Sequence, residues 1–85
     1  MSVVLKDFYA YWCGPCQMMK TVVEEFKVAH PEVEVIAINI DDEEDLAEQY
    51  EVSTIPCFVL ERDGEEVARE IGVVPLKKIE KMLEK

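Results

Sequence analysis

Residues 12–16 read Trp-Cys-Gly-Pro-Cys, a pair of cysteines separated by a glycine and a proline. The apolar run Val3–Tyr9 comes shortly before them, and from Pro15 onward apolar residues recur at spacings of three and four. The run is typical of a strand buried on both faces, and the spacing is typical of an amphipathic helix of about four turns. The pair is therefore predicted to lie between a buried strand and the start of a helix that closes at His30-Pro31.

A second strand and a short helix are predicted next. Apolar and polar residues alternate at the start of residues 33–40 and give way to a nearly continuous apolar run, as expected of another interior strand. Asp41 and Asp42 are suited to cap a helix that continues to Tyr50, because carboxylates at a helix start accept hydrogen bonds from free backbone N–H groups. The regular pattern then breaks at residues 53–56, Ser-Thr-Ile-Pro.

A hairpin and a last helix complete the pattern. Asp63-Gly64 is a two-residue turn signal between the strands Cys57–Arg62 and Glu65–Ile71. Pro75 is suited to be the first residue of a final helix with one apolar stripe. The order β-α-β-α-β-β-α predicts an α/β fold with a central four-stranded mixed sheet and helices on both faces. A chain of 85 residues is expected to form a single domain over residues 1–85.

The composition argues against several kinds of partner. The chain has 19 acidic and 9 basic residues, a formal net charge of −10, and 49% apolar residues. Such a surface repels phosphate backbones and anionic lipids, so neither nucleic acid nor a membrane is expected as a partner. No apolar stretch approaches the roughly 18 residues of a membrane span, and no signal pattern is present. We expect a monomer that resides in the cytoplasm. The alternative is a mature form whose signal peptide has been removed.

The cysteines indicate redox chemistry. Three cysteines are an odd number and too few for a disulfide scaffold. Free N–H groups and the positive dipole end at a helix start stabilise a thiolate. Cys13, just ahead of the first turn, is therefore predicted to be the more accessible residue and the nucleophile, and Cys16 to resolve the mixed disulfide. Gly14 is expected to let the loop turn, and Pro15 to fix φ where the helix begins.

Half of a zinc site is the main alternative for this spacing of two cysteines. Such a site needs two more ligands, and only Cys57 and His30 remain. Neither forms a second paired knuckle, so no metal is predicted, and the redox reaction requires no bound cofactor. Cys57 is expected to be a small buried apolar residue; the alternative is a regulatory thiol that pairs or is modified near the site.

Residues 7–16, Asp-Phe-Tyr-Ala-Tyr-Trp-Cys-Gly-Pro-Cys, resemble the active-site segment of thioredoxins. The similarity continues through Asn39-Ile40-Asp41, Tyr50-Glu51-Val52, Ile55-Pro56, Asp63-Gly64 and Ile71-Gly72. The usual N-terminal strand and helix are missing, so the chain resembles a short thioredoxin. The resemblance implies the thioredoxin fold and a protein dithiol–disulfide oxidoreductase. Its expected partners are client proteins with disulfides and a thioredoxin reductase or an equivalent electron donor.

The resemblance also implies roles around the cysteines. Pro56 would be a cis-proline packed beside the active-site disulfide. Asp7 would accept a proton from Cys16, and its place in an apolar strand should raise its pKa, because burial disfavours an ionised carboxylate. The alternative for Asp7 is a partly exposed residue with a structural role. The lysine that usually partners this aspartate is replaced by Ala37, and Lys6 should point to the opposite face of the sheet.

A client-binding patch around Cys13 is implied in the same way. Flat or small residues there would let an extended client segment approach the sulfur closely. The residues of this patch are Trp12, Gly14, Pro15, Ile55, Gly72 and Val73. For Gly72 and Val73 the alternative is ordinary strand termination.

Two other functions stay open at this point. An oxidase or isomerase of the same fold would need a less reducing pair. The dipeptide Gly14-Pro15 favours the reductase, because the oxidising branches of the superfamily usually carry a dipeptide that resembles Pro-His or Gly-His between their cysteines. A thioredoxin-like binding subunit would dock a partner without using its cysteines. The intact motif at residues 12–16 argues against it, and a Cys13→Ser variant with full biological function would favour it.

Overall fold

The computed structural model describes residues 2–85, and its elements follow the predicted order. They are β1 (Val3–Tyr9), α1 (Gly14–Ala29), β2 (Glu34–Asn39), α2 (Glu44–Gln49), β3 (Cys57–Arg62), β4 (Glu65–Ile71) and α3 (Leu76–Met82). The predicted bounds of β1, β3 and β4 are confirmed, and α1 closes at His30 as predicted. Pro75 is the N-cap of α3 and not its first residue, so that prediction is off by one position.

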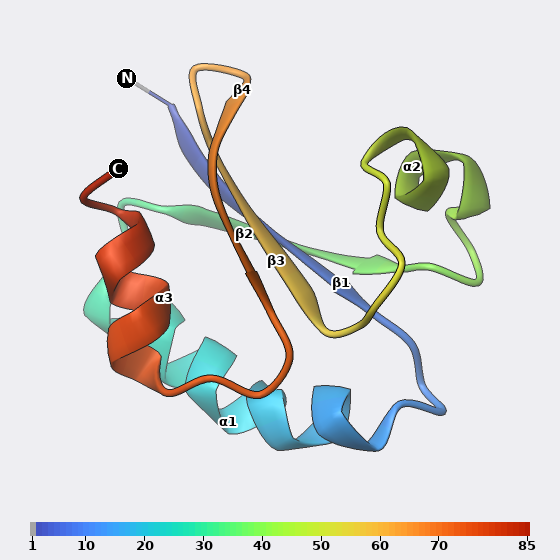
Figure 1. Ribbon diagram of the computed structural model, residues 1–85. Helices are drawn as coiled ribbons and strands as arrows, with labels where there is room; N and C mark the ends of the chain where they lie inside the picture. The colour runs from blue at the N-terminus through green and yellow to red at the C-terminus, as the bar shows by residue number, and fades with distance from the viewer. Residues whose placement is uncertain (1) are drawn as a thin grey trace.

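The strands form one mixed sheet in the order β2-β1-β3-β4, which Figure 1 shows running diagonally through the molecule. β1 pairs in parallel with β2 and antiparallel with β3, and β3 pairs antiparallel with β4. In the turn of the last hairpin, Asp63 has φ 54° and Gly64 has φ 86°. Both central residues are therefore in the left-handed region, as a type I′ turn requires. The predicted mixed sheet and hairpin are confirmed.

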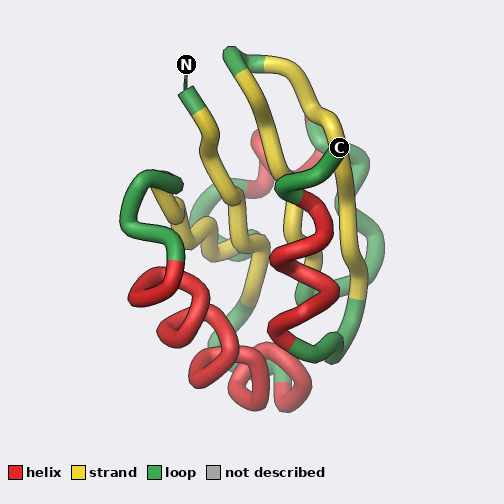
Figure 2. The backbone as a smooth tube through the Cα atoms, turned by 90° about the vertical axis from the view of Figure 1, so that its left-hand side faces the viewer, coloured by secondary structure: helices red, strands yellow, loops and turns green. Residues whose placement is uncertain are grey.

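Helices cover both faces of this sheet. α1 and α3 lie on one face, and α2 lies on the other (Figures 1 and 2). The cluster under α1 and α3 consists of Leu5, Met19, Val23, Phe26, Val33, Phe58, Leu60, Ile79 and Met82. Under α2 the buried residues are Phe8, Ile38, Cys57 and Val59. In the described part of the chain, no helix combines the length and the apolar character that crossing a membrane requires.

A polar network ties the end of α2 to the sheet. The Nζ of Lys6 donates to the hydroxyl of Tyr50 at 2.5 Å and lies 3.0 Å from the carboxylate of Glu61. The Tyr50 hydroxyl donates in turn to Glu61 at 2.5 Å. Because side chains alternate along a strand, Lys6 lies on the face opposite its neighbour Asp7, as predicted.

The start of α2 differs from the prediction. The helix begins only at Glu44, and its N-cap Glu43 makes no side-chain capping bond. The end of β2 holds the intervening residues in a turn instead. The side chain of Asn39 accepts a 2.9 Å hydrogen bond from the N–H of Asp41, and the backbone carbonyl of Asn39 accepts hydrogen bonds from the N–H groups of Asp42 and Glu43. The prediction that Asp41 and Asp42 cap the helix is wrong, because a local Asn-centred turn competes with helix formation.

Candidate active site

Cys13 and Cys16 are joined by a disulfide bond at the start of α1. Their Cα atoms are 5.2 Å apart. Cys13 is the N-cap of the helix, and its sulfur accepts a 3.1 Å hydrogen bond from the backbone N–H of Cys16. Negative charge on the Cys13 sulfur would therefore meet both a backbone donor and the positive end of the helix dipole. The arrangement favours Cys13 as a thiolate.

Accessibility does not distinguish the two cysteines. In the disulfide form Cys13 is 5% exposed and Cys16 is 6% exposed. The predicted greater accessibility of Cys13 is therefore not found. What separates the two sulfurs is the helix start, since only the sulfur of Cys13 occupies the N-cap position.

The two residues between the cysteines are both helical. Pro15 lies in the first turn of α1, where proline's missing N–H costs no helical hydrogen bond. Gly14 has no positive φ, and a Cβ placed on it would meet nothing within 4 Å. The prediction that the loop turns on Gly14 is thus wrong. Its lack of a side chain instead leaves the surface beside Cys13 uncovered.

Trp12 is hydrogen-bonded to Asp41, a residue that the sequence predicts to be a helix cap. Its side chain is 68% exposed, yet its indole Nε1–H donates a 2.8 Å hydrogen bond to the carboxylate of Asp41. Asp41 was expected to cap α2, so this contact was missed. The two residues are 29 positions apart in sequence, and no local pattern carries the signal.

The segment around Pro56 lies against the cysteine pair. The Ile55–Pro56 peptide bond is cis, as predicted. The carbonyl oxygen of Ile55 lies 3.9 Å from the sulfur of Cys13. The N–H of Gly72 donates a 2.8 Å hydrogen bond to the carbonyl of Pro56, which places the end of β4 beside this segment. Val73 follows Gly72 with its side chain 52% exposed.

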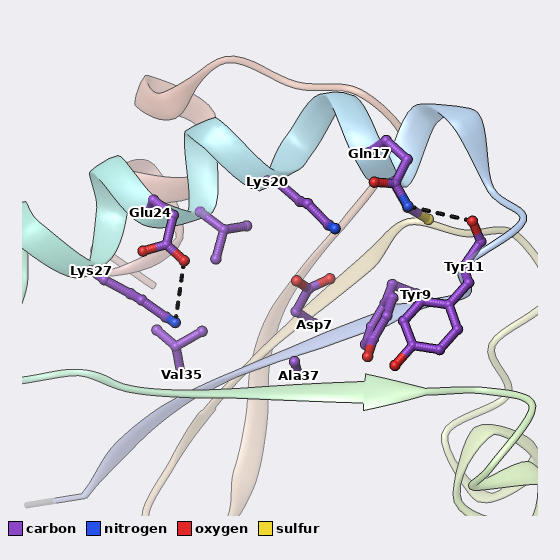
Figure 3. A pocket seen from close by; sticks show the side chains of 11 residues that line it. Asp7, Tyr9, Tyr11, Gln17, Lys20, Glu24, Lys27, Val35 and Ala37 are labelled. Atoms are coloured by element: carbon purple, nitrogen blue, oxygen red, sulfur yellow. Dashed lines mark hydrogen bonds and ion pairs between the residues drawn. The ribbon is translucent and has the colours of Figure 1, made fainter.

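Asp7 and Cys16 line one pocket between α1 and the sheet, shown in Figure 3. The pocket has a volume of about 410 Å³. Its lining residues are Asp7, Tyr9, Tyr11, Cys16, Gln17, Lys20, Val23, Glu24, Lys27, Val35 and Ala37. Burial raises the pKa of Asp7 from 3.8 to about 6, and the positive charge of Lys27 opposes that rise. The predicted direction of the shift is confirmed. The sequence reasoning missed the lysines of α1.

The two remaining candidate ligands do not complete a zinc site with the pair. Cys57 is 1% exposed in the apolar cluster under α2, and burial raises the pKa of its thiol. His30 caps the far end of α1, about 24 Å from Cys13 by the rise of a 16-residue helix, and its Nε2 lies 2.8 Å from Glu80. Among residues 2–85, no three His, Cys, Asp or Glu side chains are grouped to hold a metal ion.

Comparison with known proteins agrees with this geometry. The thioredoxin family model matches residues 1–85. The thioredoxin of Chlamydia trachomatis is 41% identical over 84 residues, covering 99% of this chain and 82% of the relative. The thioredoxin of Chlamydia pneumoniae is 47% identical over 72 residues, covering 85% of this chain and 71% of the relative. The crystal structure of oxidised mitochondrial thioredoxin 3 from Saccharomyces cerevisiae superposes with a TM-score of 0.91 at 33% identity, covering 99% and 79%.

Sequence, sheet topology and the disulfide at the helix start thus agree with one another. The chain belongs to the thioredoxin family, and it is a thiol–disulfide oxidoreductase with protein-disulfide reductase activity.

Proposed function

We propose that Cys13 is the nucleophile and Cys16 the resolving cysteine of this reductase. The Cys13 thiolate attacks one sulfur of a client disulfide, forms a mixed disulfide, and releases the other client sulfur as a thiolate. The Cys16 thiolate then attacks the Cys13 sulfur and releases the second client thiolate. Two electrons pass to the client, and the Cys13–Cys16 disulfide remains. The capping hydrogen bond from the Cys16 N–H to the Cys13 sulfur supports this order.

Asp7 accepts the proton of Cys16 in this proposal. The two residues line the same pocket, and a pKa of about 6 leaves Asp7 mostly ionised at pH 7. A general base is most effective when its pKa lies near the working pH. Asp7 is therefore able to take the thiol proton as Cys16 becomes the attacking thiolate.

Client segments dock on the surface around Cys13. Trp12, directly before Cys13, and Val73, directly after Gly72, have exposed apolar side chains, and the carbonyl of Ile55 lies beside the Cys13 sulfur. Gly14 leaves open space, and Gly72 adds no side chain to block an approaching backbone. An extended client segment with an accessible disulfide fits such a surface.

Each turnover leaves the pair oxidised, so the cycle needs a donor of two electrons. We assign this role to a thioredoxin reductase or an equivalent thiol system, and we place the protein in the cytoplasm, where thiols are kept reduced. All residues given a role come from one chain. The proposal therefore needs only a monomer with a single domain over residues 1–85.

One observation carries this proposal, namely the disulfide whose nucleophilic sulfur caps α1. The first test is the reduction potential of the pair, titrated against dithiothreitol. A value of about −270 mV is expected for a thioredoxin-type reductase, whereas roughly −180 to −120 mV would reverse the direction of electron flow. The second test is a Cys16→Ser variant mixed with a disulfide-containing protein. Mass spectrometry should find the client trapped on Cys13, and failure to form this adduct would contradict the assignment.

A further inference from the structure

The face of the sheet that carries Asp7 has no positive charge of its own nearby. Asp7 pairs in register with Ala37 on β2, whose side chain is a methyl group. β2 contains neither lysine nor arginine, and Lys6 of β1 is engaged with Glu61 on the opposite face. Within the described chain, both cations that line the pocket, Lys20 and Lys27, come from α1.

Cys16 and these lysines share one side of α1. Cys16, Lys20 and Lys27 are separated by four and seven residues, and this spacing repeats along one face of a helix. Figure 3 shows Lys20 extending from α1 in the direction of Asp7, and Lys27 extending from α1 to a position beside Val35 of β2, where its amine pairs with Glu24. The helix that presents the thiol of Cys16 thus also presents positive charge to its proton acceptor.

Lys27 has a competing partner on the same helix. Its Nζ lies 3.5 Å from the carboxylate of Glu24, and both side chains are partly exposed. Glu24 lines the pocket as well. The negative charge of Glu24 therefore opposes the effect that Lys27 has on Asp7.

The other titratable groups near Asp7 are few. Tyr9 of β1 and Tyr11 of the following loop line the pocket, and Cys57 of β3 interacts electrostatically with Asp7. β2 contributes Val35 and Ala37 to the lining, which carry no charge. Burial raises the pKa of Asp7, and the charge of Lys27 lowers it.

We propose that α1 supplies the countercharge of the proton acceptor: Lys27, opposed by Glu24, is a positioning residue that tunes Asp7 for proton transfer from Cys16. This inference rests on the proposed role of Asp7. Lys27 stabilises the ionised carboxylate before the transfer. The proton then moves from the Cys16 sulfur to Asp7, and the resulting thiolate attacks the Cys13 sulfur and expels the client thiolate.

The test is the pKa of Asp7 in the oxidised protein, followed through its side-chain carboxyl ¹³C signal. Lys27→Gln should raise that pKa, and Glu24→Gln should lower it, each by roughly 0.2 to 0.7 pH unit, the size expected of partly exposed charges. Glu25→Gln removes the same charge from the next position, which does not line the pocket, and should leave the pKa unchanged. A purely structural role for Lys27 does not predict opposite signs for its loss and for the loss of Glu24.

Lys20 provides the test between the two lysines of the pocket. If Lys20→Gln raises the pKa of Asp7 while Lys27→Gln does not, the assignment to Lys27 is overturned. If neither Lys27→Gln nor Glu24→Gln moves it, the inference fails, and the proposed role of Asp7 stands on its own evidence.

A kinetic readout separates the inference from the function on which it rests. The rate at which Cys16 resolves a mixed disulfide with an unstructured disulfide peptide is measured against pH in single turnovers. The acid midpoint should follow the Asp7 pKa in both variants, and Asp7→Asn should remove it. If the pKa shifts while the midpoint stays fixed, Lys27 does not tune the reaction, and the failure lies in the role proposed for Asp7.

Discussion

The indole of Trp12 and the carboxylate of Asp41 are joined by a 2.8 Å hydrogen bond. It ties the loop before α1 to the loop after β2. The Trp12 side chain is largely exposed, and this bond restricts the orientation of its ring. A fixed aromatic ring loses less conformational entropy when a client binds.

Asp41→Ala should therefore weaken client binding and leave the chemical step intact. A hydrogen bond of this kind contributes about 1 kcal/mol, so we expect KM for a protein disulfide to rise roughly fivefold with kcat unchanged. Steady-state reduction of insulin disulfides measures both constants. Asp42→Ala removes a neighbouring carboxylate that holds no indole and should leave KM as it is. An equal rise in both variants would point to lost surface charge instead.

Asp7→Asn should stabilise the protein at neutral pH. The folded-state pKa of Asp7 is raised from 3.8 to about 6, so the native state binds this proton more tightly than the unfolded state. Stability is then lost as pH rises through this window, by at most about 3 kcal/mol. We expect urea unfolding to show the variant more stable by roughly 1 to 3 kcal/mol at pH 7.5, with the difference vanishing near pH 3.5.

The exposed Asp45 provides the control for that measurement. Asp45→Asn removes a carboxylate of the same kind from the surface of α2 and should not reproduce the effect. If the difference in unfolding free energy between Asp7→Asn and the parent protein stays constant from pH 3.5 to 7.5, then packing, and not the charge of Asp7, is responsible for the change in stability.

Cys57 should be inert in the folded protein. It is buried in the cluster under α2, and its raised thiol pKa keeps it protonated. With the reduced native protein, iodoacetamide should modify Cys13, and Cys57 should react only after urea unfolding. Peptide mass spectrometry locates the label, and a variant with serine at both positions 13 and 16 isolates Cys57. Native labelling of Cys57 as fast as that of Cys13 would favour the regulatory alternative.

Gly72→Ala should cost stability through the backbone alone. Gly72 has φ 90°, where an L-residue is strained, yet an added Cβ meets nothing within 4 Å. We expect a loss of about 1 to 2 kcal/mol in the free energy of unfolding. Gly14→Ala is the matched control, since Gly14 also has open space around it but lacks a positive φ. The free energy of unfolding of the Gly14→Ala variant should not fall. Equal losses at both glycines would rule out the strain explanation.

Most of the fold could be predicted because its determinants are local. The apolar runs of β1 and β3 and the spacing along α1 each report burial of one segment, and the Asp63-Gly64 turn fixes the hairpin. The start of α2 could not be predicted in the same way. Asp41 has the chemistry of an N-cap, but Asn39 binds its backbone and Trp12 binds its side chain.

In the candidate site too, the residues of local motifs could be predicted, whereas the relations that depend on tertiary packing could not. The motif at residues 12–16 and the resemblance around it give the cysteines, Asp7 and Pro56. The relation of Lys27 to Asp7 depends on where α1 crosses the sheet, and the two residues are 20 positions apart. The equal burial of Cys13 and Cys16 likewise follows from packing against Ala10 and Ile55, which no helical spacing encodes.

The sulfur of Cys13 is both the reactive atom and the cap of α1, so reactivity reports on local folding. Whenever the first turn frays, the Cys16 N–H no longer reaches that sulfur, and the reduced site becomes an ordinary thiol with an ordinary affinity for protons. An unfolded chain carries the same two cysteines without this donor. The pKa of the Cys13 thiol in the reduced protein therefore depends on the fraction of molecules in which the first turn of α1 is formed.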